Sequence, residues 1–194
     1  MAGDLAINKE RSFMDIDQRR NEQEELHYLM DVIHSVGLPA EVLGEDNGFP
    51  ADTLVIAIPA EEEGGEEGGA DNHFVTVQFM PVTKEEAEYS RFLQFYTDVD
   101  IPEHEGKEEA FYRAASRMNQ ILPVGACFYL PKKEEMKIPA KFGIRHILTV
   151  NKEKHTEDTT FCETLFFLIY SYEYAEMAAR RMAAGEKPED VIVF

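Results

Sequence analysis

The sequence predicts an α+β protein, a two-layer sandwich in which an antiparallel sheet of about five strands packs against three helices. Two periodicities indicate this fold. In three segments apolar residues recur at three- and four-residue steps, as in helices with one buried side. Five shorter segments are β-branched or alternate between apolar and polar residues, as strands do. The predicted order is α-βββ-α-ββ-α, and a helix between antiparallel strand groups favours two layers.

The first helix is expected over residues 21–35, where leucine, methionine and isoleucine recur on one side. Gly37 and Pro39 follow, which is the usual order at the end of a helix. Residues 1–20 are polar and mixed in charge, so we expect an N-terminal arm that is only partly ordered. Residues 21–194 are expected to form one domain, because 194 residues fit a single domain of ordinary size.

Two strands are expected next, joined as an antiparallel hairpin. Residues 53–59 form a β-branched run that is typical of a buried strand. Residues 73–80 alternate, and three apolar side chains are expected to share one face: Val75, Val77 and Phe79. The connection over residues 61–70 is low-complexity glutamate and glycine, which favours a flexible acidic hairpin tip. A metal site there is disfavoured, because glycine pairs do not hold carboxylates in place.

Residues 81–100 allow two interpretations. A capping-box pattern at 83–86, followed by aromatic residues at helical spacing, indicates a helix. Residues 91–99 are also rich in strand-forming aromatic and β-branched side chains. We predict a short turn at 84–88 followed by a strand, with the helix as the alternative. A polar connector is expected over 98–106.

The second half of the chain is expected to contain a helix and two further strands before the final helix. The expected bounds are 107–122 for the helix, 124–130 for the first strand, 131–135 for a charged hairpin turn and 138–150 for the second strand. The alternation of the second strand breaks after Gly143, which predicts a bulge or bend near that residue.

The last helix has the strongest apolar pattern of the chain. Its stripe consists of large apolar and small residues: Phe161, Leu165, Leu168, Ile169, Tyr172, Ala175 and Ala179. Asp158 or Thr159 can cap its start, and Gly185 follows its end. Phe166 and Phe167 widen the apolar surface beyond one side. This width predicts a helix that is buried on two sides, the second by another subunit.

The charge of the chain restricts its partners. With 38 acidic and 19 basic residues, the formal net charge is −19, and this field repels nucleic-acid backbones and anionic lipid surfaces. No apolar stretch approaches the length of a membrane span, and residues 1–8 lack the features of a signal peptide. Cys127 and Cys162 are flanked by large apolar residues. We expect both to be small buried side chains in a cytoplasmic protein.

No motif predicts catalysis or cofactor binding. The six histidines include no i, i+4 pair on a helix. Glu24-x-x-His27 has the spacing found in di-iron bundles, but no second copy exists. The serines lack a nucleophile motif, and the glycines at 64–69 are interleaved with glutamates that would repel phosphate. We therefore expect a non-enzyme with no catalytic, metal-binding or cofactor-binding residues.

Two features carry a resemblance to a known family. Residues 119–125, Asn-Gln-Ile-Leu-Pro-Val-Gly, lead from the second helix into the fourth strand, and a long apolar helix ends the domain. In these features, and in element order over 21–185, the chain resembles the YbjN-like proteins and the type III secretion chaperone-like fold. The resemblance implies a small acidic homodimer that binds proteins and brings no catalytic residue. The Glu/Gly insertion and the longer N-terminal arm depart from the compact chaperones and argue against a secretion role.

Three functions follow, in order of preference. The first is a non-catalytic protein-binding module, chaperone-like or regulatory, that acts as a homodimer and takes a protein or peptide segment at a sheet edge or groove. The second is a sensory regulator that binds a small ligand between sheet and last helix, where Tyr170, Tyr172 and Tyr174 offer hydroxyls. The third and least favoured is an unrecognised hydrolase or metal enzyme.

Six residues are candidate partner contacts, although core packing explains the aromatic ones equally well: Phe92, Phe95, Tyr96, Phe142, Arg145 and His146. Arg145 and His146, with Lys141, place basic side chains on one strand of an acidic protein. If exposed, they could engage a carboxylate-bearing partner. Pairing with the protein's own glutamates and aspartates is the favoured alternative.

Overall fold

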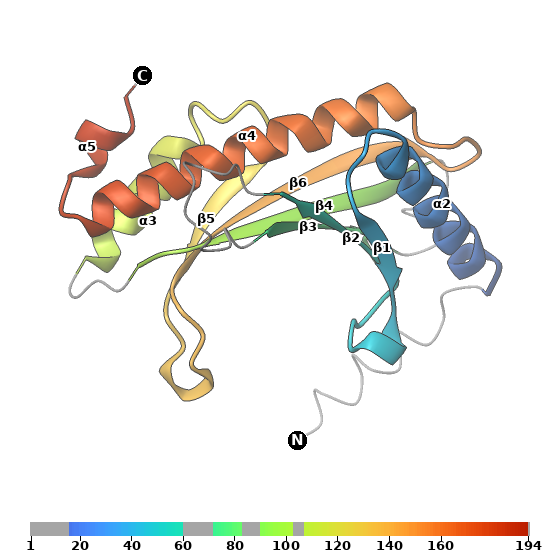
Figure 1. Ribbon diagram of the computed structural model, residues 1–194, viewed down its shortest axis with the longest axis horizontal. Coiled ribbons are helices and arrows are strands. Elements are labelled where there is room, and N and C mark those ends of the chain that lie inside the picture. The colour runs from blue at the N-terminus through green and yellow to red at the C-terminus, as the bar shows by residue number, and fades with distance from the viewer. Residues whose placement is uncertain (1–15, 60–71, 83–89, 103–106, 194) are drawn as a thin grey trace.

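The computed structural model describes residues 16–59, 72–82, 90–102 and 107–193. It confirms the predicted α+β fold class, with an antiparallel sheet and helices on one side of it (Figure 1). The described elements follow one another in this order: α2 (Ile16–Ser35), β1 (Ala40–Leu43), β2 (Thr53–Ile58), β3 (His73–Phe79), β4 (Ser90–Asp100), α3 (Glu108–Met118), β5 (Ala126–Leu130), β6 (Lys141–Asn151), α4 (Asp158–Ala183) and α5 (Pro188–Val191). Two short 3₁₀ helices lie at Glu45–Asn47 and Glu134–Met136.

The sheet has six strands, in the order β1-β2-β3-β4-β6-β5, where we expected about five. The additional strand is β1, which pairs antiparallel with β2 in the register Ala40↔Ile56 to Leu43↔Thr53. It is only four residues long and directly follows the helix-ending Gly37 and Pro39, so its sequence reads as loop. The short helix α5 was not expected either.

The last two strands of the sheet do not follow the order of the chain. It is β6, not β5, that pairs with β4. Helix α3 leads from β4 to β5, which forms the edge, and β6 returns between β5 and β4. The pairing of β4 with β6 runs without interruption from Ser90↔Asn151 to Asp100↔Lys141. This long pairing places the middle of β6 directly beside the middle of β4, which positions the site described below.

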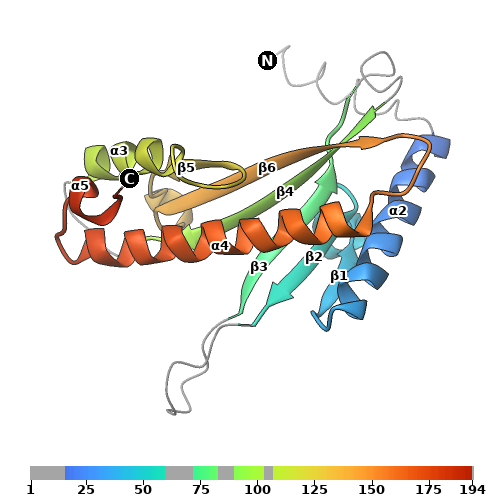
Figure 2. The same ribbon diagram turned by 90° about the horizontal axis from the view of Figure 1, so that it is seen from above.

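The described α-helices lie on one side of the sheet. Helix α4 runs along β4 and β6, with α2 near its N-terminal end and α3 and α5 near its C-terminal end (Figure 2). Between these layers lies the core, whose largest fully buried side chains include Phe95, Phe111, Phe142, Phe161, Leu26 and Leu29. Among the described helices, none combines the length and apolarity needed to cross a membrane.

Most predicted elements are confirmed with shifted ends. Helix α2 begins at Ile16, so the last five residues of the predicted N-terminal arm are helical. Its end forms a Schellman motif, in which the Leu38 N–H donates to the Ile33 carbonyl and Gly37 has a φ of 84°. Residues 90–100 form β4, so the strand interpretation is confirmed there and the helical alternative is wrong. The predicted turn at 84–88 and the acidic tip at 61–70 lie outside the described residues.

The predicted bulge near Gly143 is wrong. Gly143 pairs with Asp98 on one side and with Phe128 on the other in an unbroken register. The residue is glycine because the Phe128 ring lies over it, and a Cβ built there would be 2.6 Å from Phe128 Cε2. A packing contact, rather than a bend, therefore explains the break in the apolar pattern.

Candidate binding face of the sheet

The side of the sheet opposite the helices forms a second surface, which we call the open face. Alternate residues of a strand point to opposite sides, so in β4 Leu93 and Phe95 are buried under the helices while Phe92 and Tyr96 point away. The strand register places these side chains on the open face: Val55, Phe74, Thr76, Phe92, Gln94, Tyr96, Phe128, Arg145 and Ile147. Figure 1 shows that no described helix covers this lower side of the sheet.

The open face is unusually apolar for an uncovered surface. The side of an antiparallel sheet that faces solvent is normally polar. Here aromatic and aliphatic residues come from five strands, and two of them are well exposed, Phe74 at 53% and Ile147 at 38%. Large apolar side chains gathered on one surface mark interaction sites more often than chance exposure does, and here polar Gln94, Asp98 and Thr149 lie between them.

Arg145 lies on the open face near the middle of β6, the strand next to the edge strand β5. It pairs in register with Tyr96 of β4 on one side and with Ala126 of β5 on the other. Its side chain is exposed, and within the described residues it forms no ion pair. Lys141 behaves differently, because its Nζ lies 2.9 Å from Asp98 Oδ1 and 3.0 Å from Asp100 Oδ1. Lys141 therefore pairs with carboxylates of the protein itself, as the favoured alternative predicted. Arg145 is available to a carboxylate of a partner.

Tyr96 forms the aromatic wall beside Arg145. Its hydroxyl donates a hydrogen bond of 3.1 Å to Asp98 Oδ2, and its ring centre lies 6.4 Å from that of Phe128. Burial and the neighbouring Asp98 carboxylate raise the pKa of Tyr96, so the hydroxyl stays protonated and keeps donating. The ring is thereby held in place, which reduces the entropy that a partner contact would cost.

The structure separates the six candidate contacts into two groups. Phe92, Tyr96 and Arg145 lie on the open face. Phe95 and Phe142 are fully buried between sheet and helices, so core packing is the correct interpretation for both, and they are not available to a partner. The sixth residue, His146, also faces the helices; its ring lies 6.3 Å from Phe95, and burial lowers its pKa.

Sequence reasoning missed four apolar residues of the open face, namely Phe74, Phe128, Val55 and Ile147. A signal for the first two was present, since each is adjacent in its strand to a buried residue and therefore points the other way. Because adjacent residues of a strand point to opposite faces, Phe95 and Tyr96 cannot share a face. The same holds for Arg145 and His146. What alternation cannot tell is which of the two faces lacks a helix.

A second polar group surrounds Glu25, which is buried between α2 and the start of α4. Its Oε1 accepts hydrogen bonds of 2.7 Å from both the backbone N–H and the hydroxyl of Thr156. Its Oε2 lies 2.7 Å from His155 Nδ1 and 3.9 Å from the buried Arg91 guanidinium. These contacts occupy both carboxylate oxygens, so the group fixes α2 against the loop before α4 rather than offering a reactive centre.

The proposed small-ligand site between sheet and α4 is occupied by side chains. The Phe95 and Phe161 rings pack there with centres 5.4 Å apart. Tyr172 stacks on His73 at 3.8 Å, where burial raises the pKa of Tyr172 to about 12 and lowers the pKa of His73 to about 4. Tyr170 points outward and is exposed. The hydroxyls of Tyr170 and Tyr172 therefore do not converge on a ligand.

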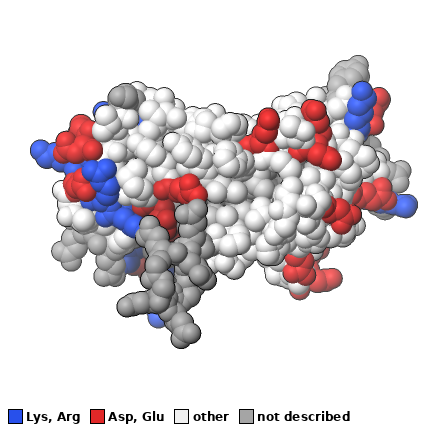
Figure 3. All heavy atoms as spheres, turned by 45° about the horizontal axis from the view of Figure 1, so that its top comes forward, with Lys and Arg blue, Asp and Glu red and all other residues white. Residues whose placement is uncertain are grey.

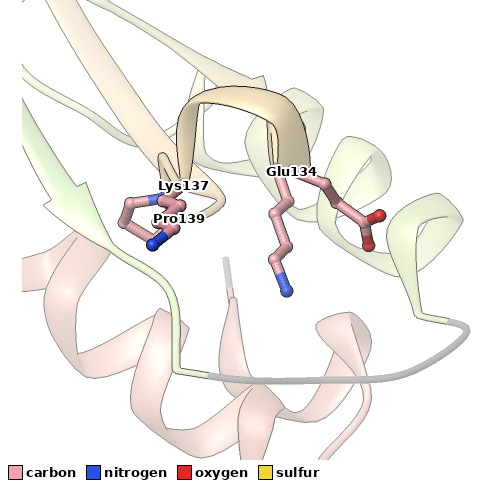
Figure 4. Close-up of a pocket in the computed structure, with 4 residues that line it drawn as sticks. Glu134, Lys137 and Pro139 are labelled. Atoms are coloured by element: carbon pink, nitrogen blue, oxygen red, sulfur yellow. The ribbon is translucent and has the colours of Figure 1, made fainter.

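Two hollows are open surface features. One, of about 370 Å³, lies in the turn between β5 and β6, where Glu134 stands on one side and Lys137 and Pro139 on the other (Figure 4). The other, of about 330 Å³, lies between α2 and β1, where Arg19 is 3.4 Å from Glu45 and 3.7 Å from Asp52. The charges of the second hollow pair with one another, and the first is an open turn lined by exposed charged side chains, so neither has a convergent chemistry.

Metal and thiol chemistry have no organised site in the part of the chain that the structure describes. No three histidine, cysteine, aspartate or glutamate side chains are grouped there so that they could hold a metal ion. Both cysteines are free, and burial raises the pKa of Cys127 to about 12, which keeps it a thiol.

Comparisons with known proteins add no relative. No protein-family model, no curated protein and no solved structure matches the chain.

Proposed function

We propose that the protein is a non-catalytic binding module, chaperone-like or regulatory, that holds a segment of another protein on the open face. The observation that carries this proposal is the apolar side of the sheet, which no described α-helix covers and on which Arg145 is exposed. An acidic chain that keeps aromatic side chains on an uncovered sheet face needs a partner for them. The engaged carboxylate of Glu25 supports a binding role over a catalytic one.

The shape of the surface favours a protein segment over a small ligand. Small ligands bind in concave pockets that bury most of their surface. The apolar residues of the open face instead spread across five strands, from Val55 on β2 to Phe128 on β5. A segment that crosses the strands can contact several of these side chains at once.

The chemistry of the segment follows from Arg145. Its guanidinium offers two parallel donors that match a carboxylate, and Tyr96 and Ile147 supply apolar contacts next to it. The proposed partner segment therefore has aliphatic or aromatic residues on both sides of an aspartate, a glutamate or a C-terminal carboxylate. The carboxylate of this segment is attracted by Arg145 although the protein as a whole is acidic. The site therefore selects segments whose carboxylate lies where it can reach this guanidinium.

A charge-swap experiment tests the proposal. Peptides are first selected from a random display library on the wild-type protein, and the selected set is expected to combine apolar residues with one acidic residue. Arg145→Glu should weaken the acidic peptides at least tenfold. Replacing the acidic peptide residue by lysine should weaken binding to wild type and restore it on Arg145→Glu.

The matched control is Lys132→Glu, the same charge change at an exposed position in the β5–β6 turn. It should leave peptide affinity within twofold of wild type. Selected peptides that bind wild type, Arg145→Glu and Lys132→Glu equally well would contradict the proposal, as would a library that yields no binder.

Self-association and location stay proposals. The homodimer is implied by the resemblance to secretion chaperones, and no surface is assigned to it here, because the exposed outer side of α4 is better suited to another occupant. Sedimentation velocity at micromolar concentration tests it, with a clean monomer counting against the resemblance to secretion chaperones. Two free cysteines suit a reducing compartment, so we propose a cytoplasmic location, which thiol labelling in intact cells would check.

A further inference from the structure

The outer side of α4 carries an exposed aromatic group that the packing of the fold does not use. Phe166 is 67% exposed, Tyr170 53% and Phe167 41%, and the Phe166 and Phe167 rings meet edge to face. Together they expose on the order of 300 Å² of aromatic surface, similar to the largest apolar patch of an ordinary monomer. We call these three residues the α4 patch. It lies on the helix side of the sheet, away from the open face.

The α4 patch is bordered by two free acidic side chains. Glu163 and Glu173 are exposed, and neither forms an ion pair with another described residue. They fall on the same ridge of the helix as Phe166 and Tyr170, at i, i+3, i+7 and i+10. Ten residues of helix place the two carboxylates about 15 Å apart along the axis. In Figure 3, where this side comes forward, a broad uncharged area has a few acidic side chains at its margin.

We propose that the α4 patch docks a basic amphipathic helix of a partner protein. The partner's apolar side would cover Phe166, Phe167 and Tyr170, and lysines or arginines ten or eleven residues apart would reach Glu163 and Glu173. Two helices that pack side by side contact each other through residues spaced three or four apart, as Glu163, Phe166, Tyr170 and Glu173 are. The net charge of −19 attracts such a partner and accelerates its encounter.

A second copy of this chain fits the same surface less well. In a two-fold antiparallel pair centred on the α4 patch, Glu163 of one copy opposes Glu173 of the other, because both lie five residues from the centre. Two strongly acidic chains also repel each other as whole molecules. The patch supplies less than half of the roughly 800 Å² per partner that a stable complex of folded proteins usually buries. The occupant favoured by charge and area is thus a single basic helix.

A model peptide tests this assignment on the full chain. The probe is a labelled 18-residue helix of leucine and lysine, and its counterpart carries glutamate in place of lysine. Fluorescence anisotropy should show one-to-one binding of the lysine peptide, weakened by added salt, and at least tenfold weaker binding of the glutamate peptide. Phe166→Ser/Tyr170→Ser should lower affinity for the lysine peptide at least tenfold. Glu163→Gln/Glu173→Gln should lower it at least threefold and reduce the salt dependence.

Two controls keep the outcome specific. Glu134→Gln/Glu135→Gln removes the same two charges at an exposed turn and should leave affinity unchanged, and Arg145→Glu, which tests the open face, should leave it undiminished. Equal affinity in the α4 variants and in the Glu134/Glu135 control would overturn the proposal. So would sedimentation showing that wild type self-associates and that Phe166→Ser/Tyr170→Ser is monomeric, because the occupant would then be a second copy.

Discussion

The side chain of Asn119 closes the edge of the sheet by pairing with the backbone of Cys127. Its Nδ2 donates to the Cys127 carbonyl at 2.9 Å, and its Oδ1 accepts from the Cys127 N–H at 2.6 Å. The amide therefore occupies the edge of β5 in the way that a neighbouring strand would. An open edge invites pairing with other chains. This contact gives a physical role to the first residue of the Asn119–Gly125 segment.

Loss of this contact should destabilise the protein. Asn119→Ala leaves two backbone groups of the edge strand without their partner, and we expect a cost of about 1–2 kcal/mol in the free energy of unfolding. Urea denaturation measures it, with the exposed neighbour Gln120→Ala as the control at close to zero. An Asn119→Ala value equal to that of Gln120→Ala would show that the edge does not need the amide.

Glu25 should be among the most sensitive polar positions. Glu25→Ala removes the acceptor of two Thr156 hydrogen bonds and leaves the buried Arg91 without its carboxylate. Breaking a buried charged group in this way costs about 3 kcal/mol. Glu24→Ala is the matched control, because its exposed pair with Arg20 contributes about 0.5 kcal/mol or less. Thermal unfolding of both variants gives the comparison, and equal melting temperatures would contradict it.

The half-buried His73 should make the protein less stable in mild acid. Burial lowers its folded-state pKa to about 4, so between pH 6.5 and 4 the unfolded chain binds a proton that the folded chain does not. The free energy of unfolding should therefore fall through this window, by about 1–2 kcal/mol once partial exposure is allowed for. His73→Phe keeps the stacking on Tyr172 and should flatten this part of the profile. If the free energy of unfolding fell with pH equally in wild type and in His73→Phe, His73 would not be the group responsible.

Gly143 and Phe128 should be coupled. Gly143→Ala forces a Cβ against the Phe128 ring, and such overpacking costs about 1–3 kcal/mol. Phe128→Leu removes the ring atoms that collide, so the double variant should be more stable than the sum of the two single changes implies. A strictly additive result in a double-mutant cycle would mean that the ring is not what excludes a side chain at Gly143.

Local periodicity predicts the parts of this fold that are set locally. The alternation of His73–Phe79 identifies its buried face correctly, and the stripe of α4 identifies its packing side. The features that were missed depend on contacts between distant parts of the chain. Glu25 and Thr156 are 131 residues apart, and Gly143 is explained only by the ring on the neighbouring strand. The candidate site was half predicted for the same reason, since alternation separates Tyr96 from Phe95 but does not say which side the helices cover.

Two-dimensional NMR with a selected acidic peptide shows whether the open face holds a protein segment. We expect peptide-induced shifts at the rings of Phe92, Tyr96 and Phe128, at the Ile147 methyl groups and at the Arg145 guanidinium. The rings of Phe166 and Tyr170 should remain unperturbed. Shifts confined to α4 or to the backbone of β5, with the open-face side chains unchanged, would contradict it.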